Sequence, residues 1–208
     1  YSVGDEKSIV DKNRKEFFQA IGLSVENVGY QRQIHSDIVQ VVGCGGDNGA
    51  SDALITKEKN LGLAIAVADC TPVFLYDLKN KVIAAVHSGW QGTEQKILLK
   101  TLLMLQKDYS SKPENMIAYI GPSISKSNYE VGKEFEEKFD KAYLKPKGDK
   151  FLLDVSGINY QILLDFGIPK NQIQKSGLCT YEFSTLFHSY RRDGNLSGRS
   201  LGVIAIKE

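Results

Sequence analysis

Two apolar runs of the sequence lead directly into reactive side chains. One run ends in Asp69 and Cys70, and the next ends in His87. Residues at the carboxyl ends of neighbouring strands can converge on one crevice, as they do in many α/β enzymes, so we expect these side chains to share a site. A second histidine, His35, lies in a polar segment upstream and is a further candidate.

His35, Cys70 and His87 supply two imidazoles and one thiol, which is a suitable set of zinc ligands. Three protein ligands, rather than four, leave a position open for water or substrate, as catalytic zinc requires. The spacings match no short zinc motif, and a free cysteine or a lone histidine is more often structural than a ligand. The same residues also suit nucleophilic catalysis, in which His87 activates Cys70 and a covalent intermediate forms. The residues alone leave both chemistries open.

The segment from residue 187 to residue 199 holds three of the five arginines in the chain. Arginine is the preferred clamp for phosphate or carboxylate, because its planar fork donates two parallel hydrogen bonds. Arg192 and Arg199 are therefore candidates for holding an anionic substrate. For one of the three arginines, an ion pair with an aspartate that ties down a glycine-rich turn is an equally good interpretation. We expect His188, in the same segment, not to be a ligand.

The elements that must position these residues follow from the hydrophobic pattern. Apolar residues at helical spacing predict helices over residues 10–21, 93–106, 130–144 and 159–166. Short runs rich in Val, Ile, Leu and Ala predict strands over residues 61–67, 73–76, 82–86, 116–120 and 201–206. Proline and glycine predict a surface loop over residues 145–150. Helices interleaved among strands favour a single-domain α/β or α+β sandwich over residues 1–208.

Composition and charge narrow the functional classes. The chain has 208 residues, of which 42% are hydrophobic and 25% charged, as is usual for a soluble globular protein. Lysine and arginine number 26 against 25 acidic residues, and no basic run favours a nucleic acid or a membrane surface as a partner. The longest apolar stretch is far shorter than the roughly 20 residues of a membrane span, and the first residues resemble no secretion signal. Three widely spaced cysteines indicate a reducing compartment, so we expect the cytoplasm and structural roles for Cys44 and Cys179.

Six segments of the sequence form a recognisable series: Gln33–Val39, Asp52–Thr56, Ala68–Val73, Ala84–Thr93, Ile120–Ile124 and Tyr190–Gly194. In this order they resemble the laccase-domain, or multicopper polyphenol oxidoreductase, family, whose members are now regarded as purine nucleoside phosphorylases. The match runs from about Val3 to the C-terminus. Its most specific part is the pair Asp-Cys-Thr-Pro and His-Ser-Gly-Trp.

The resemblance implies a four-layer α/β/β/α sandwich that holds zinc, with copper as the other candidate metal, through His35, Cys70 and His87. It also implies phosphorolysis of adenosine, inosine, guanosine and methylthioadenosine, deamination of adenosine and, in some accounts, oxidation of phenols with copper. The residues that we expect to act in catalysis are these three and Asp69. Those that we expect to bind substrate or phosphate are Gln33, Ser88, Arg192 and Arg199.

The sequence departs from the family pattern in two places. Gln91 stands where the family usually has Arg or Lys, which weakens the case for phosphate binding at this position. The family's N-terminal Ser-Thr-Arg-x-Gly-Gly segment is absent from these residues, and with it an arginine that could face the site.

The leading hypothesis is a cytoplasmic, zinc-dependent purine nucleoside phosphorylase with adenosine deaminase activity, which acts as a monomer or homodimer on a purine nucleoside and phosphate. Asp69 is the candidate that protonates the departing base. A copper-dependent phenol oxidase is an alternative, although its metal sites need more histidines than the three in this chain. A hydrolase that uses Cys70 and His87, and a zinc-stabilised binding module without activity, are the others.

Overall fold

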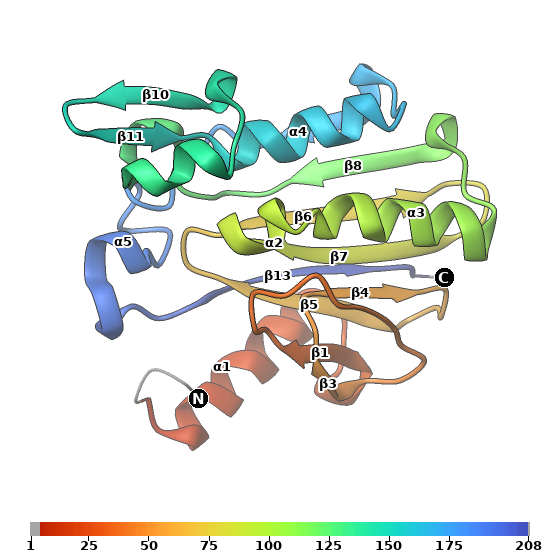
Figure 1. The fold of residues 1–208 in the computed structure, drawn as a ribbon. Coiled ribbons are helices and arrows are strands. Elements are labelled where there is room, and N and C mark those ends of the chain that lie inside the picture. The colour runs from red at the N-terminus through yellow and green to blue at the C-terminus, as the bar shows by residue number, and fades with distance from the viewer. Residues whose placement is uncertain (1–4, 208) are drawn as a thin grey trace.

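The computed structural model describes residues 5–207 and shows two β-sheets that face each other between layers of helices (Figure 1). Helix α1 (Lys7–Ala20) packs through Phe18 on the outer face of the smaller sheet. Helices α3 (Ile97–Tyr109) and α4 (Val155–Asp165) cover the outer face of the larger sheet. The layers therefore follow the order α/β/β/α, and the predicted α/β sandwich is confirmed.

The smaller sheet has four strands in the order β13-β5-β1-β3, in which β13 is antiparallel to β5 and the other pairs are parallel. Its strands are β1 (Val28–Arg32), β3 (Gly46–Ala50), β5 (Gly62–Val67) and β13 (Ser200–Ala205).

The larger sheet has six strands in the order β12-β8-β6-β7-β4-β2, antiparallel at its centre and parallel at both edges. Its strands are β2 (Val39–Val41), β4 (Ala53–Thr56), β6 (Thr71–Asp77), β7 (Val82–Ser88), β8 (Met116–Ile120) and β12 (Ile173–Lys175).

Strand β7 lies at the centre of the molecule, and all seven of its residues are buried. Because side chains alternate along a strand, Ala84 and Val86 face the cluster under α3, whereas Ile83 and Ala85 face the other sheet. Burial on both faces explains why the sequence is a continuous apolar run here rather than an alternating one. This run holds His87 in a rigid setting.

The predicted first helix, the five predicted strands and the last predicted helix are all present, with boundaries shifted by a few residues. Helix α4 begins four residues earlier than its predicted start, because the side chain of Asp154 accepts a hydrogen bond from the Gly157 N–H and caps the helix at 2.7 Å. The predicted strands divide between two sheets, however: β5 belongs to the smaller sheet, and β6 and β7 to the larger.

The helix predicted over residues 93–106 is divided in two. Helix α2 (Trp90–Glu94) ends before Lys96, whose φ of 63° places it in the left-handed region, and α3 begins at Ile97. A residue in this conformation cannot continue a right-handed helix. The break gives α2 its own direction beside the strand that carries His87.

The predictions for residues 130–150 are wrong. In place of a helix, residues 130–144 form β9 (Glu130–Val131) and two short 3₁₀ turns at Lys133–Glu137 and Lys141–Tyr143. In place of a loop, β10 (Leu144–Lys147) and β11 (Lys150–Leu153) form a hairpin whose turn places Gly148 at a φ of 63°. The hairpin packs on the apolar residues that suggested the helix, and Pro146 is tolerated because β10 is an edge strand.

The helices are short relative to a lipid bilayer. Helix α1, with 14 residues, is the longest among residues 5–207, whereas a membrane span takes about 20 apolar residues. Within this part of the chain, no helix is long and apolar enough to cross a membrane.

Candidate metal centre and substrate cleft

The structure brings His35, Cys70 and His87 together at one end of the two sheets. His87 is the next-to-last residue of strand β7, and Cys70 directly precedes β6, which pairs with β7. His35 lies in the connection between β1 and β2. One potential ligand atom from each lies within 4.8 Å of the others. The Cys70 Sγ and the His35 Nε2 are 3.9 Å apart, and the two imidazole centroids are 5.0 Å apart.

The His35 segment is shaped by the buried carboxylate of Asp52. His35 has a φ of 59°, and the backbone N–H groups of Ile34, His35 and Ser36 all donate to the two oxygens of Asp52, at 3.2, 3.1 and 2.6 Å. The Ser36 hydroxyl donates a fourth hydrogen bond at 2.7 Å. Successive N–H groups that converge on one anion make a stable concave turn. The carboxylate therefore fixes the loop that carries His35.

The same carboxylate also orients His87. The His87 Nδ1 donates to the Asp52 Oδ1 at 2.8 Å, and both side chains are almost wholly buried. Because an ionised carboxylate only accepts, Nδ1 carries a proton, and Nε2 is the nitrogen that remains for a contact with Cys70 or a metal. A carboxylate behind a histidine is the usual partner of a metal-binding imidazole. Sequence reasoning missed this role of Asp52; the only signal was a lone acid directly ahead of an apolar run.

The three polar groups at the centre shift one another's protonation. Burial raises the pKa of Cys70, but the neighbouring His87 and His35 outweigh it and lower this pKa to about 6. Burial lowers the pKa of His87, but the Cys70 thiolate and the Asp52 carboxylate outweigh it and raise this pKa to about 9. Burial raises the pKa of Asp52, but the hydrogen bonds from His87 and Ser36 lower it to about 2. A thiolate is therefore favoured at neutral pH, as a metal ligand or a nucleophile requires.

The residues present fit a zinc ion. With zinc–nitrogen bonds near 2.0 Å and zinc–sulfur bonds near 2.3 Å, a tetrahedral site separates a nitrogen and a sulfur ligand by about 3.5 Å. The observed 3.9 Å between Cys70 and His35 is close to this separation. Two nitrogen donors, one sulfur donor and a carboxylate behind one histidine also match the donor types that zinc prefers.

Gly89 has no side chain, and this provides the space that Cys70 and His35 occupy. A Cβ atom at this position would lie 2.9 Å from the Cys70 Sγ and 3.2 Å from the His35 Cδ2. Any larger residue would push the thiol and the imidazole from their present positions. The glycine of the His-Ser-Gly-Trp segment thus has a steric role.

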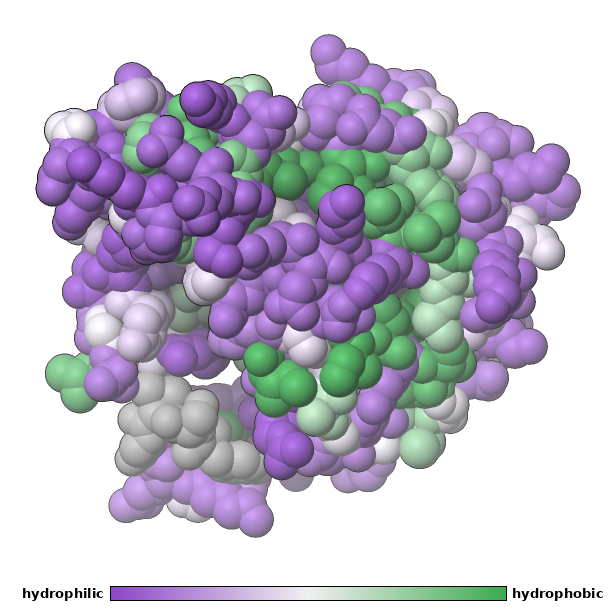
Figure 2. Space-filling model, viewed as in Figure 1, coloured by the Kyte–Doolittle hydropathy of each residue, from purple (hydrophilic) through white to green (hydrophobic). Residues whose placement is uncertain are grey.

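The centre lies at the junction of two hollows, which share His35, Ala68, Cys70 and Tyr190. The first, which we call the arginine hollow, has a volume of about 910 Å³ and is also lined by Arg14, Tyr30, Arg32, Gln33 and Arg199. The second, which we call the aromatic hollow, has a volume of about 480 Å³ and is also lined by Asp69, Trp90, Gln91, Tyr129 and Arg191. On the face drawn in Figure 2, hydrophilic residues cover much of the surface, with hydrophobic residues in patches between them.

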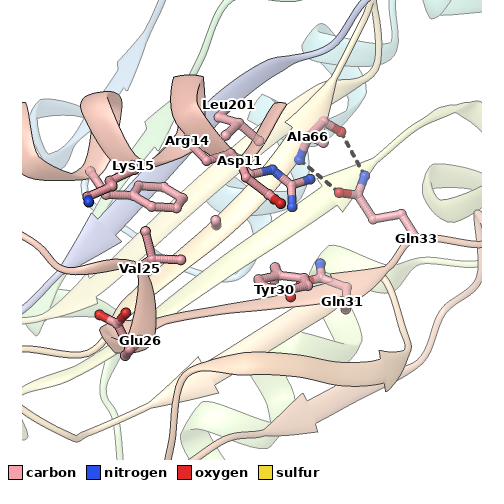
Figure 3. Close-up of a pocket in the computed structure, with 12 residues that line it drawn as sticks. Asp11, Arg14, Lys15, Val25, Glu26, Tyr30, Gln31, Gln33, Ala66 and Leu201 are labelled. Atoms are coloured by element: carbon pink, nitrogen blue, oxygen red, sulfur yellow. Dashed lines mark hydrogen bonds between the residues drawn. The ribbon is translucent and has the colours of Figure 1, made fainter. Parts of the chain in front are cut away.

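The arginine hollow continues beneath α1 into a smaller pocket of about 300 Å³, drawn in Figure 3. Arg14 comes from α1 and lies over the Tyr30 ring, with its guanidinium carbon 5.5 Å from the ring centroid. Gln33 exchanges two hydrogen bonds of 2.8 Å with the backbone of Ala66, shown as dashed lines in Figure 3. The predicted substrate ligand Gln33 therefore lines the cleft, but its amide is bound to β5.

The other predicted substrate ligands differ in their placement. Arg199 lines the arginine hollow, where its guanidinium carbon lies 5.9 Å from the Tyr190 ring centroid. Arg192 lines neither hollow: its five N–H donors bind Asp193 and the carbonyls of residues 180, 181 and 187. Ser88 is fully buried and bonds to the Thr93 hydroxyl at 2.8 Å. Arg192 and Ser88 thus hold the protein's own structure, as the alternative interpretation of an arginine in this segment predicts.

Asp69 lines the aromatic hollow, but its carboxylate is occupied. The Thr180 hydroxyl and the Arg191 backbone N–H each donate to one of its oxygens at 2.6 Å. Asp69 joins the C-terminal loop to the centre, and both of its oxygens accept hydrogen bonds from the protein. The role of Asp69 as proton donor stays a prediction.

Four of the five arginines line the two hollows, which sequence reasoning found only in part. Arg14 lies on the first helix and Arg32 at the end of β1, and no local pattern distinguishes either from a surface cation. Tyr129 and Trp90 were also missed as lining residues. They are held in place by the hairpin region, where the Trp90 ring packs 5.0 Å from Phe135.

The fold and the centre define a class of proteins. Residues 1–207 match the family model described as multi-copper polyphenol oxidoreductase laccase, and the chain belongs to this family. The chain is 35% identical to a purine nucleoside phosphorylase of Bacteroides thetaiotaomicron, over 98% of this chain and 82% of that protein. It is 32% identical to the purine nucleoside phosphorylase YlmD of Bacillus subtilis, over 99% of this chain and 80% of that protein.

Solved structures agree with this assignment. The crystal structure of the hypothetical protein YfiH from Bacillus licheniformis matches with a TM-score of 0.94 at 30% identity, over 99% of this chain and 84% of that chain. That of YlmD from Geobacillus stearothermophilus matches with a TM-score of 0.90 at 26% identity, over 99% of this chain and 83% of that chain. The resemblance found in the sequence is confirmed.

Proposed function

We propose that this protein is a zinc-dependent purine nucleoside phosphorylase, which cleaves adenosine, inosine, guanosine and methylthioadenosine with phosphate and also deaminates adenosine. The observation that carries the proposal is the position of His35, Cys70 and His87 at the junction of two hollows. Relatives named purine nucleoside phosphorylase support the reaction class. A purine nucleoside and phosphate are the substrates, and the cytoplasm stays the predicted location.

His35, Cys70 and His87 would hold the zinc ion, with Asp52 behind two of them. Zinc in such a site supplies Lewis-acid chemistry and activates water at neutral pH, which adenosine deamination requires. The protein contributes the Cys70 thiolate and fixes one proton on the His87 Nδ1, so zinc would bind at Nε2 in place of the proton that the raised His87 pKa keeps there in the metal-free protein. Copper is the other candidate metal.

The arginine hollow is the better place for phosphate. Three guanidinium groups, from Arg14, Arg32 and Arg199, line it, and arginine binds phosphate through parallel hydrogen bonds. In phosphorolysis a phosphate oxygen attacks the anomeric carbon of ribose. The bond from that carbon to the base nitrogen breaks, and its electron pair leaves with the base, which takes up a proton. Guanidinium groups hold the nucleophile in position without a covalent step.

A cysteine hydrolase is the second candidate function. The lowered pKa of Cys70, with two imidazoles beside it, favours this alternative. In such an enzyme the Cys70 thiolate attacks an electrophilic carbon of the substrate, and the bond from that carbon to the leaving group breaks as the leaving group takes a proton from an imidazolium. Water then attacks the same carbon, breaks the carbon–sulfur bond and regenerates the thiolate. This enzyme differs from the leading proposal in one measurable respect: turnover and the covalent adduct at Cys70 persist when metal is removed.

Chromatography of adenosine incubated with the zinc-loaded protein, with and without phosphate, tests the proposal. Adenine should appear only with phosphate, and inosine should mark the deaminase reaction. His87→Ala should lose zinc and both activities. His188→Ala is the matched control, because this exposed histidine lies outside the centre, and it should keep both.

The remaining outcomes separate the alternatives. If His87→Ala kept the wild-type zinc content and rates, the proposed centre would be wrong. Turnover that survives chelation, with a mass adduct at Cys70, would favour the cysteine hydrolase. Oxygen uptake with a phenol in the copper-loaded protein alone would favour an oxidase. Unfolding on metal removal without any purine turnover would favour a binding module.

A further inference from the structure

The aromatic hollow contains an amide side chain that the protein itself does not use. Gln91 lies in the first turn of α2 and lines the hollow, and within residues 5–207 its amide has no hydrogen-bond partner. The charged groups around it are engaged. Asp69 accepts from Thr180 and Arg191, and the Arg191 guanidinium donates to the Glu130 carbonyl and lies over the Tyr129 ring at 5.0 Å.

The two hollows differ in a way that assigns the parts of a nucleoside. The arginine hollow has three guanidinium groups, whereas Trp90 and Tyr129 line only the aromatic hollow, beside Tyr190, which lines both. Aromatic walls suit a flat, weakly polar base, which stacks on them. A volume of about 480 Å³ is within the range of small-molecule sites. Because Cys70 and His35 lie where the hollows meet, a base in one and phosphate in the other leave the glycosidic bond beside the centre.

We propose that the aromatic hollow binds the purine base and that the Gln91 amide hydrogen-bonds to the group at position 6 of the base. The side chain at position 91 then determines whether 6-amino purines, 6-oxo purines or both are accepted. The inference rests on the proposed phosphorylase function. It names a specificity-determining residue and the orientation of the substrate.

The chemistry of an amide defines what Gln91 accepts. Its carbonyl accepts one hydrogen bond and its NH₂ group donates two, and the group can turn over to exchange their positions. A 6-amino purine offers a donor beside a ring-nitrogen acceptor, and a 6-oxo purine offers an acceptor beside an N–H donor. Gln91 can pair twice with either edge, so the native protein accepts both adenosine and inosine. A side chain that only accepts, or only donates, can satisfy one edge and opposes the other.

Gln91→Glu and Gln91→Lys test the inference in opposite directions. The measured quantity is the ratio of kcat/KM for adenosine to that for inosine, from initial rates of adenine and hypoxanthine release. Gln91→Glu should raise the ratio about tenfold, because a carboxylate accepts from the amino group and repels the 6-oxo oxygen. Gln91→Lys should lower it about tenfold, because an ammonium donates to the 6-oxo oxygen. Gln106→Glu and Gln106→Lys, on an exposed face of α3, carry the same charge changes and should leave the ratio unchanged.

The ratio also distinguishes a direct contact between Gln91 and the base from a merely structural role of Gln91. Loss of local structure would lower both rates together, and Gln91→Met should do this without moving the ratio. Ratios that stay within twofold of wild type in both charged variants, or that move in the same direction, would overturn the inference.

A binding measurement separates failure of the inference from failure of the proposed function. Free adenine and hypoxanthine are titrated into wild type and both charged variants in a calorimeter. If wild type releases no base from any nucleoside but the two variants shift base affinity in opposite directions, the phosphorylase proposal fails and the base site stands. If the nucleosides are cleaved but neither the ratio nor the base affinities change in the variants, the phosphorylase proposal stands, and Gln91 does not contact the six-position of the base.

Discussion

Two buried carboxylates, Asp52 and Asp69, support two different walls around the candidate metal centre, and they stabilise different parts of the structure. Asp52 is fully buried and binds the His35 loop and the His87 ring. Asp69 is 8% exposed and binds Thr180 and Arg191, which lie 111 and 122 residues away along the chain. Asp52 therefore supports the candidate metal ligands, and Asp69 attaches the loop of Thr180 and Arg191 beside the aromatic hollow.

The difference shows how this fold would separate the proposed metal site from the proposed substrate site. The wall held by Asp52 is built on β4 and β7, whose residues are buried from end to end. The wall held by Asp69 is built from loops. The Asp69 backbone carbonyl, for example, accepts a hydrogen bond of 3.0 Å from the N–H of Ile124, which lies in a further loop. A rigid wall keeps ligand geometry within narrow limits, and a loop wall can vary with the substrate.

Asp52→Ala should have the largest effect, because it removes support from two candidate ligands at once. We expect zinc affinity to fall by about 10-fold to 100-fold. Four donors and an imidazole would lose their acceptor in a buried setting, so the free energy of unfolding should fall by about 3 kcal/mol. Competition with a zinc chelator and urea unfolding measure the two quantities. Asp165→Asn, in the last turn of α4, is the control. Wild-type zinc affinity in Asp52→Ala would show that the two walls are not functionally distinct.

Asp69→Asn should affect substrate binding while sparing the metal. Asp69 has a φ of 86°, a conformation that asparagine also tolerates, so the substitution isolates the loss of charge and of one acceptor. We expect zinc affinity within about twofold of wild type, since no ligand contacts this carboxylate, and a loss of roughly 1–3 kcal/mol in stability. Michaelis constants for adenosine and phosphate should rise about tenfold as the loop loosens. A drop in zinc affinity equal to that of Asp52→Ala would contradict the division between the walls.

The same division separates what the sequence predicts from what it does not. Cys70 and His87 follow apolar runs directly, and this local pattern is sufficient to find them. The residues that support the centre and line the cleft cannot be found in this way. Asp52 and Arg14 contact residues that are distant in sequence, and nothing in their own segments indicates those contacts. The division of the predicted strands between two sheets is likewise a property of the tertiary structure, although the runs themselves are correct.

The error over residues 130–150 has a physical cause. Val131, Phe135 and Phe139 recur every four residues, which is the spacing of a helical stripe. In the structure Val131 lies in β9, Phe135 in a 3₁₀ turn and Phe139 just after that turn. Their cluster is completed by Leu144, Leu153 and Val155. Tertiary packing decides the conformation of such a segment more than its periodicity does. This cluster supports Trp90, so the mispredicted segment also shapes the substrate side.

Asp77 gives the smallest expected effect and tests whether any buried carboxylate would behave like the two in the cleft. It lies at the end of β6 and accepts from the N–H groups of Lys79 and Asn80 and from the Asn80 amide, all within 3.0 Å. Burial raises its pKa, but the neighbouring Ser111 side chain and these hydrogen bonds outweigh burial, and the net pKa is lowered. A carboxyl with a lowered pKa contributes stability above its unfolded pKa, near 4, and loses it as pH falls through the folded value.

Asp77→Asn should therefore lower the free energy of unfolding by about 1 kcal/mol at pH 7, and the difference from wild type should shrink as pH falls below about 4. Urea unfolding at several pH values between 3 and 7 measures this. Zinc affinity and both Michaelis constants should stay at wild-type values, because Asp77 lines neither hollow. A difference that grows on acidification would mean that the native carboxyl has a raised pKa. A loss of zinc would mean that the effects of Asp52 and Asp69 reflect general stability rather than the two walls.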